Sequence, residues 1–294
     1  MLFTIFTPSY NRAKLLGRVY SSLLVQSCKD FEWIVVDDGS HDETQSVMRK
    51  YIMEDKIPIK YIQQNNHGKH SAHNEALKHS SGKWFICVDS DDVLSVNALY
   101  DISLQLHKTT KEDCGLVGYK VDFHNKLLCS TFPKGVQHIN AYELDHTFGL
   151  TGEFAYVFKT EIISKYLFPV IEDEKFITEN VLYDALAIDN FKLVLCPIII
   201  TECEYQKDGL TSNQYRVLKN NPIGYMLYYK QRISLARSLK TAIGYAVRYH
   251  AFRCLGKVKK DRYQGKYKVL VDACELPGKA VVYYYKYKFK KMNL

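Results

Sequence analysis

The stretch WFICVDSDDVL, residues 84–94, joins a short apolar run directly to a group of carboxylates. Residues 84–88 are all apolar, which is typical of a buried strand. Asp89, Asp91 and Asp92 follow at once, and their negative charges repel one another. Asp92 is explained as the N-cap of a helix over the apolar-periodic residues 94–106. The helix cap does not explain Asp89 and Asp91. They either belong to an ordinary acidic loop or offer hard oxygen ligands to a divalent cation that bridges to an anionic substrate.

Upstream of this stretch, strand and helix patterns alternate. Short apolar runs typical of strands cover residues 2–7, 31–36 and 57–62. Helical spacing of apolar residues follows each of them, near residues 15–24, near 42–53 and before Gly82. Strands that alternate with crossover helices predict an α/β fold with a mostly parallel sheet flanked by helices.

Each of the four predicted strands is followed by a polar cluster. These are TPSYNR (residues 7–12), DDGSHDE (37–43), NNHGKH (65–70) and DSDD (89–92). Ligands of parallel α/β sheets bind beyond the carboxyl ends of the strands. The four clusters are therefore expected to face one shared cleft.

The rest of the chain divides by charge. Strands are expected near residues 114–123, 153–158 and 191–200, a helix at 178–188, and helical structure from 215 onward. Residues 215–294 hold 19 Lys and Arg against three acids, about +16, and the whole chain carries +8, so residues 1–214 carry about −8. We expect an α/β domain over 1–214 and a basic Tyr/Lys-rich helical extension over 215–294.

Composition also bounds the cellular setting. The sequence has no apolar run of 18 residues, so a transmembrane helix is not expected. The first residues lack a basic segment and a small-residue cleavage site, and the eight cysteines form no CxxC pair. These features favour a reducing, cytoplasmic location. His70 and His73 lie three residues apart, but no further ligand set at zinc spacing surrounds them.

Four motifs in this order carry a family resemblance. FTPSYNR (6–12), FEWIVVDDGSHDET (31–44), NNHGKHSAHNEAL (65–77) and FICVDSDD (85–92) resemble the family 2 glycosyltransferases with the GT-A fold, of the bacterial surface-polysaccharide type. The resemblance is strong over roughly the first 110 residues and weakens toward residue 214. It implies inverting, metal-dependent transfer from a nucleotide-sugar, a UDP-sugar, to a glycan or lipid-linked acceptor.

The resemblance also implies roles for individual residues. Tyr10 matches the position that stacks on the base, Asp38 the group that hydrogen-bonds the base, and Asp89 the ribose contact. Asp91 matches the ligand of Mn²⁺ or Mg²⁺, while Asp37 is expected to be structural. The remaining positions implied to bind the nucleotide-sugar are Lys69, near the nucleotide, and the motif residues Pro8, Ser9, Arg12 and Ser90.

An inverting transfer needs a general base. The family takes it from an acidic pair at a helix start, which EKFITENVLYDAL (174–186) matches. Glu179 fits the first acid and is the predicted base, whereas Asn180 stands at the second position and cannot accept a proton. Asp173 and Asp184 are the other candidates for the base. Alternatively, Glu179 is only an acid in the first turn of the helix, favoured there by the helix dipole.

A loop after the last predicted strand, EYQKDGLTSN (204–213), matches a segment that closes over donor or acceptor in relatives. Lys207, Thr211 and Ser212 have suitable chemistry there. A solvated loop without a binding role is the alternative interpretation.

The basic tail holds 12 of the 23 tyrosines. A solvated helical face, a nucleic-acid surface and a membrane surface are the three interpretations. Basic residues attract anionic lipid and tyrosine favours the interface, whereas no nucleic-acid recognition signature is present. We therefore expect peripheral contact with the inner face of the cell membrane and no nucleic-acid partner.

Two rival functions remain open at this stage. A sugar-phosphate nucleotidyltransferase would want a Gly-rich phosphate loop after the first strand, which TPSYNRAKLLG does not supply. A non-catalytic nucleotide-sugar-binding protein would keep the cleft and lack the base, and Asn180 keeps this alternative open. Donor hydrolysis separates an enzyme from such a binding protein.

Overall fold

The computed structural model describes residues 1–204 and 214–292, which divide into two compact units. The first unit comprises Met1–Leu167 with residues 190–204, and the second comprises Phe168–Asp189 with residues 214–292. This division differs from the expected boundary at residue 214 in one segment. Residues 168–189 group with the C-terminal helices because helix α7 (Asn180–Ile188) packs on helix α9 (Pro222–Leu235).

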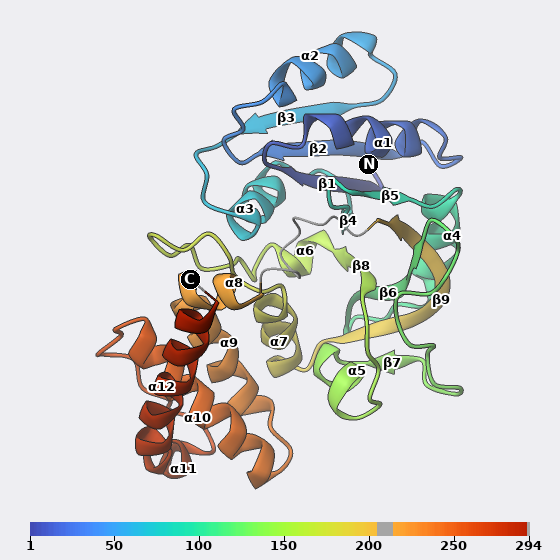
Figure 1. Cartoon of the computed structure of the whole chain (residues 1–294). Helices are drawn as coiled ribbons and strands as arrows, with labels where there is room; N and C mark the ends of the chain where they lie inside the picture. Colours follow the sequence, from blue (N-terminus) through green and yellow to red (C-terminus); the bar gives the residue numbers. More distant parts are fainter. Residues whose placement is uncertain (205–213, 293–294) are drawn as a thin grey trace. The chain divides into compact units, whose positions relative to one another are not determined.

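The first unit alternates strands and helices, as the sequence predicts (Figure 1). Its strands are β1 Phe3–Ser9, β2 Phe31–Asp37, β3 Ile59–Gln63, β4 Trp84–Cys87, β5 Asp92–Leu94, β6 Asp113–Asp122, β7 His138–Ile139, β8 Phe154–Lys159 and β9 Lys192–Cys203. Its helices are α1 Ala13–Leu24, α2 Thr44–Glu54, α3 Lys69–His79, α4 Ala98–Gln105, α5 Ala141–His146 and α6 Thr160–Ile163, with a 3₁₀ turn η1 at Leu106–Lys108.

Within the described residues the strands form one nine-stranded sheet in the order β3-β2-β1-β4-β8-β6-β9-β5, with β7 beside β9. The first four strands of this order are all parallel. The second half is mixed, because β8 runs antiparallel to both β4 and β6, while β6 and β9 are parallel. The expected α/β fold with helices along a largely parallel sheet is confirmed.

Helices cover both faces of the parallel half. On one face, α1 and α2 pack on alternate residues of the strands, including Phe3, Ile5, Trp33 and Val35, all fully buried, while α4 packs on β9 of the mixed half. On the other face, α3 covers the residues between them, and the His73 ring lies 5.8 Å from that of Phe6. Both faces are apolar because a parallel sheet is buried on both sides.

The strand register aligns the carboxyl ends of the parallel strands. Ser9 at the end of β1 pairs with Asp37 at the end of β2, which pairs in turn with Gln63 at the end of β3. Phe6 pairs with Cys87, the last residue of β4. The polar clusters that follow these strands therefore start from the same edge of the sheet.

The interpretation of Asp92 as a helix N-cap is wrong. Asp92 begins the short strand β5, which pairs antiparallel with β9 through Asp92 and Cys203. Helix α4 starts only at Ala98, after Asn97 in a left-handed conformation with φ of 66°. The pairing with β9 is more than 100 residues away in sequence, so the local apolar period could not reveal it.

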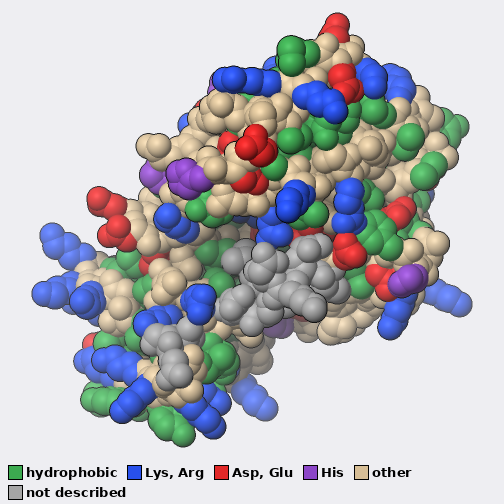
Figure 2. Space-filling view, turned by 45° about the horizontal axis from the view of Figure 1, so that its top comes forward, with side chains coloured by type: hydrophobic (Ala, Val, Ile, Leu, Met, Phe, Trp, Pro, Cys, Tyr) green, Lys and Arg blue, Asp and Glu red, His purple; other side chains and the backbone are tan. Residues whose placement is uncertain are grey.

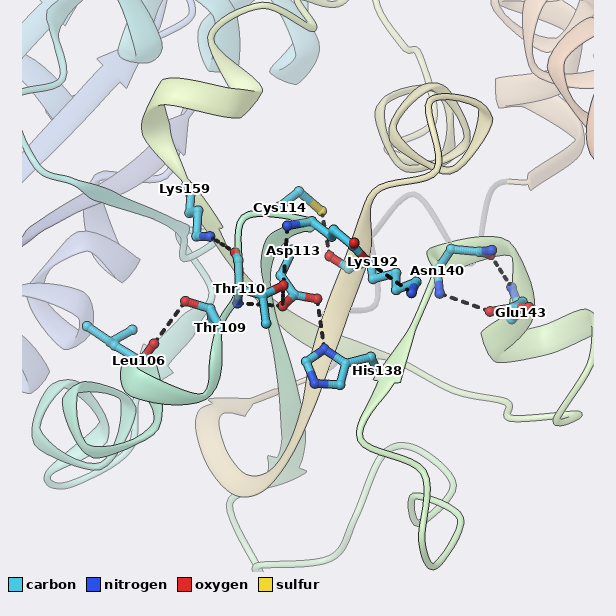
Figure 3. Close-up of polar contacts among 11 residues, drawn as sticks. Leu106, Thr109, Thr110, Asp113, Cys114, His138, Asn140, Glu143, Lys159 and Lys192 are labelled. Atoms are coloured by element: carbon cyan, nitrogen blue, oxygen red, sulfur yellow. Dashed lines mark hydrogen bonds and ion pairs between the residues drawn. The ribbon is translucent and has the colours of Figure 1, made fainter.

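Asp113 is a buried structural acid at the edge of the sheet opposite the carboxyl ends of the parallel strands (Figure 3). Asp113 at the start of β6 is fully buried, and its carboxylate accepts hydrogen bonds from the Thr110 backbone N–H (2.7 Å) and hydroxyl (2.8 Å). Its other oxygen lies 2.9 Å from Nδ1 of His138 in β7. Burial alone would raise the pKa of Asp113, but these partners outweigh it and lower that pKa. The network ties β7 to β6.

The second unit contains helix α7 and the basic C-terminal helices. These are α8 Gln214–Asn220, α9 Pro222–Leu235, α10 Leu239–Leu255, α11 Lys268–Ala273 and α12 Glu275–Lys291. Their core is rich in aromatic side chains, with Tyr249 and Phe252 fully buried. The Glu174 carboxylate accepts hydrogen bonds from the Ile223 and Gly224 backbone N–H groups and so caps α9. In the part of the chain that the structure describes, no helix is both long and apolar enough to cross a membrane.

We predict that Glu32 stabilises the parallel half of the sheet in a pH-dependent way. Its buried carboxylate lies 2.7 Å from the Lys60 ammonium and accepts hydrogen bonds from Ser81 and Thr4. Burial opposes the charge, but these partners outweigh burial and lower the pKa of Glu32 to about 2. A lowered pKa contributes stability above the unfolded-state pKa, about 3 kcal/mol for this shift, which is lost as pH falls through the folded-state value.

The measurement is urea unfolding of the wild type and Glu32→Gln between pH 7 and pH 2. The variant should be less stable by about 3 kcal/mol at pH 7, and the difference should shrink below roughly pH 4. Glu112→Gln is the matched control, because its exposed pair with Lys192 (3.4 Å) is worth little. A Glu32→Gln deficit that stays constant with pH would contradict the assignment.

Candidate functional site

The loops that follow β1 and β2 are joined by hydrogen bonds. Asn11, in a left-handed conformation with φ of 54°, donates its backbone N–H to the Ser40 hydroxyl (2.8 Å) and accepts at its side-chain oxygen from the His41 N–H (2.8 Å). The backbone N–H of Asp38 donates to the Ser9 carbonyl (2.8 Å). The first two polar clusters therefore form one connected surface.

Asp38 connects this surface to the third cluster. One oxygen of its buried carboxylate accepts from the Gln64 side-chain amide (2.7 Å) and the His67 N–H (2.8 Å), and the other accepts from the Gly68 N–H (2.8 Å). Gly68 precedes α3 and has φ of 91°, a conformation that favours glycine. A carboxylate offers about four lone-pair sites, so roughly one remains for a ligand.

The neighbouring acid, Asp37, is fully engaged inside the protein. It accepts from the Ser40 N–H (2.8 Å) on one oxygen and from the Tyr61 hydroxyl (2.5 Å) on the other. Its side chain is buried, with 1% of its surface exposed. These contacts support the structural role expected for Asp37.

The third and fourth clusters meet through an ion pair. The Lys69 ammonium, at the first residue of α3, lies 2.7 Å from one oxygen of Asp89 and 2.8 Å from the other. Both side chains are about one-third exposed, so they line a surface that a ligand can reach. Four clusters from four different strand ends are thus brought together at one edge of the sheet.

A second cation, Lys120, reaches the same acidic group from β6. Its ammonium lies 2.9 Å from the Asp92 carboxylate, and both side chains are largely buried. Burial opposes the charge on Lys120, but the carboxylates of Asp92 and Asp89 outweigh burial and raise the pKa of Lys120. Sequence reasoning missed this residue. The only signal was a single cation within the apolar strand GLVGYKV, residues 115–121.

The three acids of the DSDD cluster differ in electrostatic setting. For Asp92, burial raises the pKa although Lys120 opposes this. For Asp89, burial is outweighed by Lys69 and Lys120, and its pKa is lowered. For Asp91, burial together with the negative charges of Asp89 and Asp92 raises the pKa, although Arg12 partly opposes this. Asp91 therefore stands in a negative field that a bound cation would relieve.

The donor set fits a hard divalent ion. Within residues 1–204 and 214–292 no group of three or more His, Cys, Asp or Glu side chains is arranged to hold a metal. Mg²⁺ and similar ions instead use one or two carboxylates together with substrate phosphates and water. Asp91, half-buried and in a negative field that Arg12 only partly offsets, has the chemistry for that role.

The other predicted nucleotide-binding residues surround this edge. Tyr10 is 45% exposed, so its ring is available for stacking. Ser9 is buried, and its hydroxyl has no hydrogen-bond partner among the described residues. Pro8 is half-buried within β1, and Ser90 is buried between Asp89 and Asp91.

The predicted catalytic base lies in the second unit. Glu179 is half-buried, directly precedes α7, and lies near Tyr225. Burial and the charge of this carboxylate raise the pKa of the Tyr225 hydroxyl to about 12. Asp184 is completely buried and accepts from Nε of Arg232 at 2.6 Å, so it serves packing of α7 on α9. Asp173 is exposed and has φ of 67°. Lys207, Thr211 and Ser212 lie outside the described residues.

Comparisons with known proteins give consistent matches. Residues 4–166 match the family described as Glycosyl transferase family 2. Over 103 residues the chain is 33% identical to poly(ribitol-phosphate) beta-N-acetylglucosaminyltransferase TarS of Staphylococcus aureus, a match that covers 34% of this chain and 18% of that protein. Over 220 residues it is 26% identical to UDP-Glc:alpha-D-GlcNAc-diphosphoundecaprenol beta-1,3-glucosyltransferase WfgD of Escherichia coli, covering 74% of this chain and 83% of that protein.

Solved structures show the same fold. A crystal structure of S. aureus TarS in complex with UDP-GlcNAc superimposes with a TM-score of 0.60, covering 95% of this chain and 88% of that chain at 17% identity. The mannosyltransferase PcManGT from Pyrobaculum calidifontis, in complex with GDP-Man and Mn²⁺, gives a TM-score of 0.50 at 16% identity and covers 94% of this chain and 69% of that chain. At such identities these likenesses establish the fold alone.

We predict that Lys120 and Asp92 are energetically coupled. Lys120→Met leaves a largely buried carboxylate without its partner and should lower the free energy of unfolding by about 3 kcal/mol. Adding Asp92→Asn removes the uncompensated charge, so the double variant should regain much of that loss. Chemical unfolding of both single variants and the double variant measures the coupling. Additive effects of the two substitutions would show that the pair is not coupled.

Proposed function

The chain belongs to glycosyl transferase family 2, and on that premise we propose that it is an inverting, metal-dependent glycosyltransferase. Its donor is a nucleotide-sugar of the UDP type, and its acceptor is a glycan or a lipid-linked sugar of a cell-surface polysaccharide. The observation that carries this proposal is the meeting of four strand-end clusters, with Asp38, Lys69, Asp89 and Asp91 at one edge of the sheet.

Two relatives support the choice of substrates. WfgD is named for a UDP-Glc donor and a diphosphoundecaprenol acceptor, and the match covers most of both chains. TarS is named for transfer of N-acetylglucosamine to poly(ribitol-phosphate), although the match covers only about a fifth of its length. Both are named as transferases of a sugar, which favours transfer over sugar-phosphate activation.

Donor binding follows from the residues of the first unit. Tyr10 offers an exposed ring for the base, and Asp38 offers the lone pair that its contacts with the α3 loop leave over. The Asp89 carboxylate accepts hydrogen bonds from the ribose hydroxyls, while Lys69 fixes the orientation of that carboxylate. Pro8, Ser9, Arg12 and Ser90 complete the donor-binding surface, with the Arg12 charge close enough to influence Asp91.

The negative charge of the departing nucleoside diphosphate explains why the acidic cluster of residues 89–92 would hold a metal ion. A Mn²⁺ or Mg²⁺ ion held by Asp91 would act as a Lewis acid for the charge on the departing nucleoside diphosphate. The chain's own contribution is to place Asp91 beside Asp89, which is paired with Lys69, and Asp92, which is paired with Lys120.

Glu179 is the proposed general base. It takes the proton of the acceptor hydroxyl while the acceptor oxygen bonds to the anomeric carbon. The bond from that carbon to the donor phosphate breaks with its electron pair, and attack from the opposite side inverts the configuration. Asp184 is already paired with Arg232, which favours Glu179 over it.

We also propose the cellular location of the protein and a separate role for each part of the chain. Residues 1–214 carry donor binding, and the basic extension 215–294 provides peripheral contact with the inner, cytoplasmic face of the cell membrane. Its charge of about +16 supports attraction to anionic lipid. Nucleic acid is not a partner in this proposal.

The metal requirement is tested with a panel of nucleotide sugars and a lipid-linked or glycan acceptor. EDTA should abolish transfer, and Mn²⁺ or Mg²⁺ should restore it. Asp91→Asn should lose activity while keeping its fold, because an amide is a much weaker ligand than a carboxylate. Asp30→Asn, at an exposed position of the same unit, is the matched control. Full activity of Asp91→Asn in chelator would refute the metal role.

The base is tested by substitutions that keep side-chain shape. Glu179→Gln should reduce kcat on the order of 10²–10⁴-fold with little change in donor binding, because it removes only proton acceptance. Glu172→Gln, at an exposed position of the same segment, should be near normal. If Glu179→Gln is near normal and Asp173→Asn inactive, the assignment of the base is wrong. Donor binding without hydrolysis or transfer by the wild type would favour a non-catalytic binding protein.

A further inference from the structure

Helix α12 presents two sides of opposite character. Its inner side carries Gly278, Val282, Tyr285 and Phe289, spaced four, three and four residues apart, and these residues are buried or half-buried. At Gly278 an added Cβ would lie 2.3 Å from His250 Cβ of α10, so the two helices cross closely. The Tyr285 ring lies 5.0 Å from that of Phe252. These contacts fix the rotation of α12 about its axis.

The outer side carries apolar and phenolic groups at the same spacing. Leu276, Ala280, Tyr283 and Tyr287 again stand four, three and four residues apart, and all four are exposed. Leu276 and Tyr283 are each 76% exposed, and Tyr287 is 63% exposed. We call these four residues the Tyr ridge. Single exposed apolar groups are ordinary, but a ridge along about three turns calls for a partner surface.

Lysines flank the Tyr ridge. Lys286, Lys290 and Lys291 are exposed, and no acid in the described part of the chain pairs with them. The single acid of α12, Glu275, lies 3.0 Å from Lys279 at the helix start. The Lys288 ammonium instead lies 5.6 Å from the Tyr284 ring centre. Figure 2 shows Lys and Arg side chains gathered beside hydrophobic ones over the C-terminal helices.

We propose that the Tyr ridge and its three lysines form the surface by which this chain lies on an anionic lipid bilayer. The proposal deepens the membrane contact stated above and rests on that part of the proposed function. Tyrosine has an apolar ring and a polar hydroxyl, so it is suited to the depth of lipid headgroups. The lysines reach the anionic surface while their stems cover apolar area.

Charge excludes a second copy of this face as the occupant, because two lysine-flanked ridges would repel each other. A nucleic-acid occupant is disfavoured by the residue types. Every cation of α12 is a lysine, whereas specific phosphate recognition uses the planar fork of arginine. A diffuse anionic surface needs only point charges near it.

The test is co-sedimentation of the full chain with vesicles of phosphatidylcholine alone and of equal parts phosphatidylcholine and phosphatidylglycerol. The intact chain should bind the anionic vesicles and bind the neutral ones weakly. Lys286→Gln/Lys290→Gln/Lys291→Gln should lower partitioning by up to about 100-fold, since each lysine near such a surface contributes up to about fivefold. Salt should release part of the intact chain, and Tyr283→Ser/Tyr287→Ser should remove the part that resists salt.

Lys257→Gln/Lys259→Gln/Lys260→Gln is the matched control, because it removes the same charge from exposed positions of the same unit. It should lower partitioning much less than the α12 triple variant. Circular dichroism checks that each variant folds. The proposal is overturned by absent binding to anionic vesicles, by equal losses in the two triple variants, or by preferential binding to single-stranded RNA offered in competition.

Donor hydrolysis by the same preparations, measured without vesicles, tests the proposed enzyme activity separately from the proposed membrane surface. The α12 variants should hydrolyse donor as the wild type does, because no predicted donor-binding residue lies on α12. Vesicle binding without hydrolysis by the wild type would remove the enzyme proposal and leave the membrane surface supported. Hydrolysis without vesicle binding would remove only the membrane surface.

Discussion

The hydrogen bonds of the Asp38 carboxylate are the constraint on which the proposed donor-binding edge depends. Parallel pairing aligns Ser9, Asp37 and Gln63, so the loops after β1, β2 and β3 start side by side. The buried Asp38 side chain then holds the loop before α3 through Gln64, His67 and Gly68. That loop determines where α3 begins, and α3 begins with Lys69, the partner of Asp89. Burial strengthens these bonds because the local dielectric is low, and for the same reason the loss of one would leave a costly unpaired polar group.

The acidic cluster shows how the fold manages charge before any ligand arrives. Lys69 and Lys120 approach Asp89 and Asp92 from α3 and β6, two elements far apart in the chain. Burial raises the pKa of Asp92 despite Lys120, and burial together with the charges of Asp89 and Asp92 raises the pKa of Asp91. An acid placed in such a field is poised for a cation, and the two lysines keep the strand end from being driven apart. In the second unit the cations outnumber the acids, and three exposed lysines of α12, Lys286, Lys290 and Lys291, have no acidic partner among the described residues.

Sequence reasoning succeeded where the signal is local. The four strand-end motifs, the early strands and helices and the shared edge could be predicted because apolar period and turn chemistry act over short distances. Asp92 was misassigned because its partners, Cys203 and Lys120, come from distant strands. Gln64 and Lys120 were missed for the same reason. The grouping of residues 168–189 with the C-terminal helices depends on pairs such as Asp184 with Arg232, which no local pattern announces.

The most direct measurement is a crystal structure of the protein soaked with UDP and Mn²⁺, with an anomalous difference map for the metal. We predict an anomalous peak beside the Asp91 carboxylate, with the nucleotide base against Tyr10 and Asp38 and the ribose at Asp89. UDP bound away from the four strand-end loops, or a metal peak with no contact to Asp91, would contradict the central claim that these loops form one donor site.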